Sequence, residues 1–356
     1  MRILFVTTDL MAGRTLLSLH QPLLSRGHQI LVAAEGKSLD VWSENNIPVD
    51  FRGEVDPKLT ELDLTEVWES VDLLVAGTSD PANLERTLAL KARERAVPVV
   101  IFPDIWNGSR RLGDFEPDLI LCIDSIAAKE ETARLGEKRV AVVGDPALES
   151  FRKIKTSGRL KVTIQRLWAS NLDERRTLLL VGHGAGYASE DLVDWVVDSI
   201  LLSPDWMVVP RLLHPDPRKH DLGLKAYWEK RQKELPEGAV VELDRQEFST
   251  DELAMALPMT VSGFSTPLRA AVVGGEMGVS VGTEKLLDAL YRGTGFHRYP
   301  LARIGVTAES DRPEDLDQFH GLNYRQIRDQ GALYNSSAQW DPEGACEAIE
   351  SLASSS

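Results

Sequence analysis

The sequence predicts an α/β protein with two Rossmann-like, doubly wound parallel-sheet domains that face a central cleft. Three observations predict this fold. Short apolar runs rich in Val, Ile and Leu alternate with helix-like stretches along the chain, as in parallel sheets whose strands are buried on both faces. The alternation stops after Asp145-Pro146 and restarts at Thr177. The length of 356 residues also suits two domains better than one.

In the first half, the apolar runs predict strands at residues 3–6, 29–33, 72–76, 98–102, 119–123 and 139–143. Helical patterns lie between them: one carries Leu16 and Leu23 on one face and ends at Gly27, and others cover 83–95 and 126–135. Strands that alternate with helices in this way predict βαβ units with parallel strands.

The second half repeats this pattern, with strands predicted at residues 177–181, 206–210, 239–243, 259–262, 278–281 and 304–306. We therefore expect an N-terminal domain over 1–150, a helical linker over 151–175 and a C-terminal domain over 176–335. Residues 336–356 hold a final helix, about 342–352, that is expected to pack back on the N-terminal domain.

The net charge and the cysteine count limit which kinds of partner and which cellular compartment are expected. The net charge of −15 argues against nucleic acid as a partner, because phosphate backbones are bound by basic surfaces. Cys122 and Cys346 are the two cysteines, too few for a disulfide framework or a zinc site. The sequence shows no signal-peptide pattern and no transmembrane segment, so a cytoplasmic location is expected. Oligomeric state is left open.

Ligands of open parallel sheets bind beyond the carboxyl ends of the strands, so the loops after each predicted strand are the candidate sites. The C-terminal domain opens with Val181-Gly-His-Gly-Ala-Gly186 before a helix at about 189–202. Its Gly182, His183 and Gly184 would let main-chain N–H groups approach a phosphate at the positive end of the helix. The alternative is a tight turn without a ligand.

Two further loops of this domain carry polar side chains. Arg211 and His214 follow a predicted strand and are candidates for a diphosphate or ribose, the alternative being a basic surface loop. Ser262, Ser265 and Thr266 also follow a strand; Ser265 or Thr266 would cap the next helix, with Pro267 at its first position, and would bind phosphate at the same place.

In the N-terminal domain, Asp9, Gly13 and Arg14 follow the first strand, and the loop 77–81 ends at the same edge of the sheet. A third loop after residue 102 combines a carboxylate, an aromatic ring, an amide and a cation, at Asp104, Trp106, Asn107 and Arg110. Such side chains are typical of sugar-binding surfaces. The alternatives are a plain strand-to-helix turn and a docked aromatic loop.

The chain resembles the GT-B superfamily of nucleotide-sugar glycosyltransferases and the related UDP-sugar 2-epimerases over nearly its whole length. Four motifs carry the resemblance: Arg26-Gly-His28 before the second strand, Gly144-Asp-Pro146, His214-Pro-Asp-Pro217, and Ser265-Thr266 with Ala270 and Gly274. The resemblance implies that the C-terminal domain holds the nucleotide diphosphate and the N-terminal domain the acceptor.

The sequence departs from the family pattern at three places. Arg269 stands where the family has a ribose-binding Glu, the Gly-Thr-Arg-Pro-Glu start of the 2-epimerases is replaced by Thr7–Arg14, and the His of the acceptor loop is missing. The catalytic base is therefore not assigned by analogy.

These observations leave three hypotheses. The first is a metal-independent glycosyltransferase, since no D-x-D motif follows a predicted strand; it would move a sugar from a UDP-type donor to a carbohydrate or lipid-linked acceptor, as in polysaccharide biosynthesis, and use no cofactor. Asp9 or Asp104 would deprotonate the acceptor hydroxyl. The second is a nucleotide-sugar 2-epimerase or hydrolase, and the third is a non-catalytic binding protein of the same fold.

Overall fold

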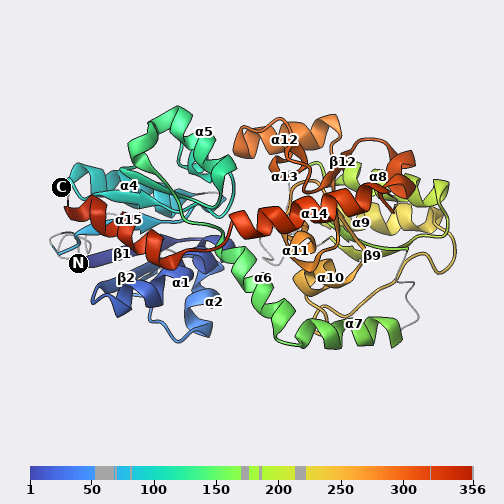
Figure 1. Cartoon of the computed structure of the whole chain (residues 1–356), viewed down its shortest axis with the longest axis horizontal. Helices are drawn as coiled ribbons and strands as arrows, with labels where there is room; N and C mark the ends of the chain where they lie inside the picture. Colours follow the sequence, from blue (N-terminus) through green and yellow to red (C-terminus); the bar gives the residue numbers. More distant parts are fainter. Residues whose placement is uncertain are drawn as a thin grey trace. The chain divides into compact units, whose positions relative to one another are not determined.

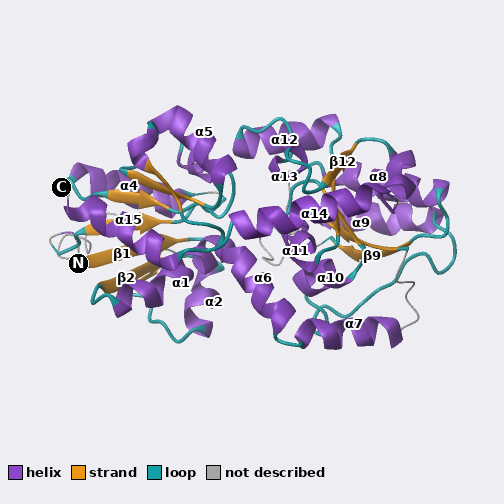
Figure 2. Ribbon diagram, viewed as in Figure 1, coloured by secondary structure: helices purple, strands orange, loops and turns teal. Residues whose placement is uncertain are grey.

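The computed structural model describes residues 1–52, 68, 70–80, 82–169, 176–183, 187–212, 222–320 and 322–354. The chain forms two compact units, and each contains a parallel sheet covered by helices (Figure 1 and Figure 2). The first unit comprises Met1–Ala147 and Ala338–Ser356, and the second comprises Leu148–Ser337. The predicted class, two doubly wound parallel-sheet α/β domains, is confirmed.

The sheet of the first unit has seven strands in the order β3-β2-β1-β4-β5-β6-β7, and every neighbouring pair is parallel. Its six longer strands match the six predicted runs, and the two-residue edge strand β3 was not predicted because so short a segment has no pattern of its own. The strands are β1 (Arg2–Thr7), β2 (Gln29–Ala34), β3 (Phe51–Arg52), β4 (Leu73–Ala76), β5 (Val99–Ile101), β6 (Leu119–Cys122) and β7 (Val140–Val142).

Two helices of the first unit begin within three residues of the end of a strand. Asp9 caps α1 by accepting from the Ala12 N–H, and Asp124 caps α5 in the same way, which satisfies main-chain donors that have no partner within a helix. The helices are α1 (Leu10–Ser25), α2 (Ser38–Glu44), α4 (Asn83–Glu94), α5 (Ser125–Leu135) and α15 (Pro342–Ser354), with the 3₁₀ helices η3 (Gly108–Leu112) and η4 (Glu137–Arg139).

The last segment of the chain joins the first unit through the end of β7. Gly144 has a φ of +82°, and a Cβ there would clash with the carbonyl oxygen of Gln339, so only glycine suits the position. The Asp341 N–H bonds to the Val143 carbonyl over 2.8 Å, and Trp340 stacks on Phe102. The helix α15 that follows packs against α1, where Arg26 pairs with Glu350.

The second unit has a five-stranded parallel sheet in the order β12-β11-β10-β8-β9. Aliphatic side chains of these strands pack with Trp195, Trp206 and Trp228 in one core. The strands are β8 (Thr177–Val181), β9 (Met207–Arg211), β10 (Met259–Ser262), β11 (Met277–Val281) and β12 (Ala308–Ser310).

Two strand predictions in this unit were wrong. Residues 239–243 form only one isolated bridge, between Val240 and Val208, and the residues Glu242 and Asp244 that come next are exposed to solvent. Residues 304–306 form a turn in which Gly305 has a φ of +74°, and the strand starts two residues later, at Ala308.

Helices α6 (Pro146–Thr156) and α7 (Arg159–Ala169) occupy much of the segment expected to be a helical linker. Among the described residues, no helix is long and apolar enough to cross a membrane. The other helices are α8 (Ser189–Leu202), α9 (Leu222–Arg231), α10 (Thr250–Ala256), α11 (Pro267–Gly274), α12 (Glu284–Thr294), α13 (Pro300–Arg303) and α14 (Leu322–Ser337), with η6 (Gln232–Glu234) and η7 (Pro313–His320).

Candidate functional site

Three strands of the second unit end in register at its candidate site. Val181 at the end of β8 pairs with Arg211 at the end of β9, and the Ser262 hydroxyl at the end of β10 donates to the Val181 carbonyl over 2.8 Å. The carboxyl ends of neighbouring parallel strands are where ligands of doubly wound sheets bind. The fold therefore brings Gly182, His183, Arg211 and Ser262 to one edge, as the sequence predicts.

His183 is buried, with 7% of its surface exposed, and links β8 to the loop after β10. Its Nε2 accepts from the N–H groups of Gly263, at 3.2 Å, and Phe264, at 3.4 Å. We assign the unprotonated nitrogen to Nε2 from these donors. The imidazole also stacks on the Phe264 ring, with centroids 4.2 Å apart. Two N–H groups at the entry to α11 are thus bonded within the protein.

Arg211 is a buried cation whose donors are largely unused. Only 4% of its surface is exposed; Nη1 donates to the Pro210 carbonyl, whereas Nε and Nη2 are buried and have no hydrogen-bond partner among the described residues. Burial, helped by the nearby Arg245, lowers the pKa of this guanidinium to about 10. Buried donors without partners are costly, and an anion would satisfy both of them through charge-assisted bonds.

The loop between β10 and α11 differs in detail from the prediction. Neither Ser265 nor Thr266 caps α11 with its side chain: Thr266 has helical backbone angles and makes no cap bond, and the Ser265 hydroxyl donates to Ser262 over 2.7 Å. Pro267 does occupy the start of the helix, as predicted. The Ser262 and Ser265 hydroxyls thus form a short chain that begins at the end of β10.

Two of the predicted donor contacts, Gly184 and His214, lie outside the described residues. Gly182 is described and packs closely on the end of β9, because a Cβ at this position would lie 3.0 Å from the Leu212 carbonyl oxygen. At the start of α8, Asp191 bonds to Thr283 and Lys285.

In the first unit, the residues after β1 that the sequence predicts to bind an acceptor also make structural contacts. Both carboxylate oxygens of Asp9 accept from main-chain N–H groups, of Ala12 at 2.9 Å and Asp80 at 3.3 Å. Gly13 is buried where α1 meets α2, and a Cβ there would lie 3.1 Å from Ser38 Cβ. Arg14 is exposed on α1.

The loop after β5 is mostly buried. Asp104 is 6% exposed, with one oxygen 3.9 Å from Arg111. The Trp106 indole, 4% exposed, donates to the capping residue Asp124 over 2.7 Å. Its ring thus fixes the loop to the start of α5.

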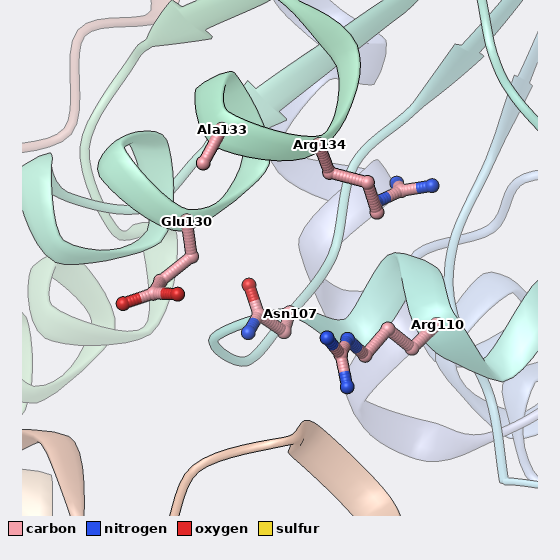
Figure 3. A pocket seen from close by; sticks show the side chains of 5 residues that line it. All are labelled: Asn107, Arg110, Glu130, Ala133 and Arg134. Atoms are coloured by element: carbon pink, nitrogen blue, oxygen red, sulfur yellow. The ribbon is translucent and has the colours of Figure 1, made fainter.

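Asn107 and Arg110 line a pocket of about 230 Å³ together with three residues of α5. Figure 3 shows Asn107 on the loop, Arg110 on the helix η3, and Glu130, Ala133 and Arg134 on α5. Asn107 has a φ of +52°, in the left-handed region that asparagine tolerates. The structure thus brings two of the predicted acceptor contacts together and adds helix residues that the sequence did not indicate.

A buried polar cluster at the same edge was missed. The Glu85 carboxyl is 0% exposed and accepts from the hydroxyls of Thr8, at 2.8 Å, and Ser79. Burial raises its pKa to about 7. Thr8 and Ser79 follow predicted strands, and this position is the one feature of the sequence that could have indicated the cluster. The sequence does not distinguish Glu85 from the exposed acidic and basic residues of the same helix.

The structure is similar to several solved structures at low sequence identity. It matches UDP-GlcNAc 2-epimerase from Neisseria meningitidis bound to UDP-GlcNAc with a TM-score of 0.62 and 13% identity over 100% of both chains. Alr3699/HepE from Anabaena in complex with UDP gives 0.64 and 15%, also over 100% of both chains. The glycotransferase of kitacinnamycin gives 0.59 and 11%, over 99% of this chain and 98% of the other.

No protein-family model matches the sequence, and no curated protein matches it. At these identities the structural likeness concerns the fold alone. It agrees with the resemblance seen in the sequence motifs: the chain has the two-domain GT-B fold found in UDP-sugar 2-epimerases and in glycosyltransferases.

Proposed function

We propose that this protein is an enzyme that binds a nucleotide sugar, of the UDP type, in its second unit and transfers the sugar to an acceptor hydroxyl without a metal ion. The observation that supports this most is Arg211, a buried guanidinium at the carboxyl ends of β8 and β9, two of whose donors have no partner in the part of the chain that the structure describes. A nucleoside diphosphate would supply the oxygens that these donors lack.

The same residue suits the chemistry of transfer. When the bond between the anomeric carbon and the phosphate breaks, negative charge grows on the leaving diphosphate, and a preorganised cation beside it lowers the barrier. Gly182, Ser262, Ser265 and Thr266 lie around these strand ends and would complete the donor site, with Gly184 and His214 as further candidates. The acceptor, a carbohydrate or a lipid-linked sugar, would bind to the first unit.

A second candidate is sugar 2-epimerisation. Structures titled as UDP-GlcNAc 2-epimerases, from Neisseria meningitidis and Methanocaldococcus jannaschii, are among those similar to this chain. The two functions share a UDP-sugar site and differ in the product. An epimerase converts the UDP-sugar without an acceptor and without releasing UDP, whereas a transferase or hydrolase releases UDP.

The test begins with binding. Melting temperature should rise with UDP or UDP-sugars, because a ligand of the native state stabilises it; GDP-, CMP- and TDP-sugars are the comparison. Arg211→Ala should weaken UDP binding about 10- to 100-fold, the value of one or two charge-assisted hydrogen bonds. Arg176→Ala is the matched control, because Arg176 is an exposed arginine before β8 that pairs with Asp205. No binding by the wild type would refute the proposal, and equal affinity of both variants would remove Arg211 from the site.

A further inference from the structure

Glu85 lies beneath the carboxyl edge of the first sheet, in the first turn of α4. Its Oε2 accepts from Thr8, the residue after β1, and its Oε1 accepts from Ser79, which follows the adjacent strand β4. One carboxyl group therefore joins the two loops at the centre of the edge where an acceptor would bind.

No cation offsets the charge of this carboxyl within the described part of the chain. The charged group that acts on it is Asp9, which further raises its pKa. On the η3 side, Arg111 donates to the Thr78 carbonyl over 2.7 Å and lies 3.9 Å from Asp104. Asp80, in the loop after β4, faces Asp9 through its main-chain N–H. Burial therefore dominates, and Glu85 exchanges a proton near neutral pH.

The hydrogen-bond directions leave one route for that proton. The Ser79 oxygen already accepts from the N–H groups of Thr8, at 3.1 Å, and Asp9, at 2.8 Å, so its lone pairs are occupied. The Thr8 oxygen donates to Glu85 over 2.8 Å and accepts no hydrogen bond from the described residues. Thr8 is half-buried, whereas Glu85 is fully buried, so Thr8 is the more exposed member of this hydrogen-bonded pair.

We propose that Thr8 and Glu85 form a proton relay for the acceptor hydroxyl. This inference rests on the proposed transferase function. The acceptor gives its proton to Oγ1 of Thr8 while Thr8 passes its own proton to Oε2 of Glu85. The acceptor oxygen keeps its electron pair and forms the bond to the anomeric carbon, and the nucleoside diphosphate leaves with the electrons of the bond that breaks. The proton then returns from Glu85 to solvent through Thr8.

In this relay Asp9 is not the base that deprotonates the acceptor, which is the role that the sequence suggested for it. Both oxygens of Asp9 are held by main-chain donors at the start of α1 and in the loop after β4. Asp9 therefore positions the loop that carries Thr8, and the proton goes to the carboxyl of Glu85 in α4.

The first experiment follows the Glu85 carboxyl directly. In protein labelled with ¹³C at glutamate carboxyls, one resonance should titrate near pH 7 and be missing in Glu85→Gln. Thr8→Val should move this titration to higher pH, since it removes a donor to the ionised form. A wild-type protein in which no glutamate titrates between about pH 5.5 and 8.5 overturns the relay, and this result requires no variant to fold.

The second experiment is the pH profile of UDP release from a UDP-sugar. Glu85→Gln and Thr8→Val should lower kcat by about 10²- to 10⁴-fold and lose the limb near pH 7, with KM and UDP affinity unchanged. Thr8→Ser, which keeps the hydroxyl, should restore the limb. Glu252→Gln is the control, because Glu252 is a buried glutamate that is paired with Arg159 in the second unit.

The two proposals fail in different ways. A wild-type limb that persists in Glu85→Gln overturns the relay while UDP binding stands. Absence of UDP binding by the wild type overturns the proposed function, and with it the acceptor that the relay serves.

Discussion

The main-chain N–H of Gly263 donates a hydrogen bond to Nε2 of His183 over 3.2 Å, and so joins the loop after β10 to the end of β8. The Phe264 N–H donates to the same nitrogen. A histidine that the sequence predicts to contact a phosphate thus holds the loop that leads into α11. Substitution of His183 should therefore destabilise the second unit even when no ligand is bound.

His183→Ala should lower the free energy of unfolding of the second unit by about 2–4 kcal/mol, because two N–H groups lose their acceptor and the Phe264 ring loses its stacking partner. Urea unfolding followed by tryptophan fluorescence would measure this. His297→Ala is the control: His297 also stacks on an aromatic ring, Tyr291, but both are exposed, and its cost should stay below about 1 kcal/mol. Equal costs would contradict the bridging role of His183.

Arg211→Met should stabilise the ligand-free protein, by about 1–3 kcal/mol, because it removes buried donors that have no partner. This direction is opposite to that of most core substitutions. The same variant should lose the rise in melting temperature that UDP causes in the wild type. Thermal melts with and without UDP measure both effects. A variant less stable than the wild type would show that Arg211 is satisfied in the free protein.

Glu85→Gln should change how stability depends on pH. The Glu85 pKa is about 7 in the folded protein and about 4.3 when unfolded, so the folded state holds the extra proton between these values. The contribution of the protonated Glu85 carboxyl to the free energy of unfolding is fully present below about pH 4.3. It is lost as the pH rises through 7, where the buried carboxyl ionises.

Relative to wild type, Glu85→Gln should therefore gain up to about 4 kcal/mol between acidic pH and pH 8. Urea midpoints of the two proteins at several pH values give this difference directly, since other groups cancel. A constant difference across the range would mean that Glu85 keeps an ordinary pKa.

Gly144→Ala should strongly destabilise the first unit, because the added Cβ meets the carbonyl oxygen of Gln339 and the backbone has a φ of +82°. Gly305 separates the two effects: it lies in a turn with a φ of +74°, but a Cβ there has no neighbour within 4 Å. Gly305→Ala should cost about 1 kcal/mol, and Gly144→Ala clearly more. Hydrogen exchange of α15 should rise only in the Gly144 variant.

Much of the candidate site was visible in the sequence because the carboxyl ends of buried strands can be located from apolar runs. Asp9, Arg211 and Ser262 were found in this way. Their hydrogen bonds were not predictable. Whether Arg211 meets a carboxylate depends on atoms from segments far away in the chain.

What the sequence alone determined is the fold class. Runs of Val, Ile and Leu between helical patterns specify strands buried on both faces, and burial of apolar surface depends on local composition and period. Tertiary structure decided which polar groups are buried and what they contact. In the sequence, Glu85 resembles the other charged residues of its helix. In the folded protein it accepts hydrogen bonds from Thr8 and Ser79 and is buried. Desolvation and hydrogen bonding act between residues distant in the chain, so only the folded protein shows them.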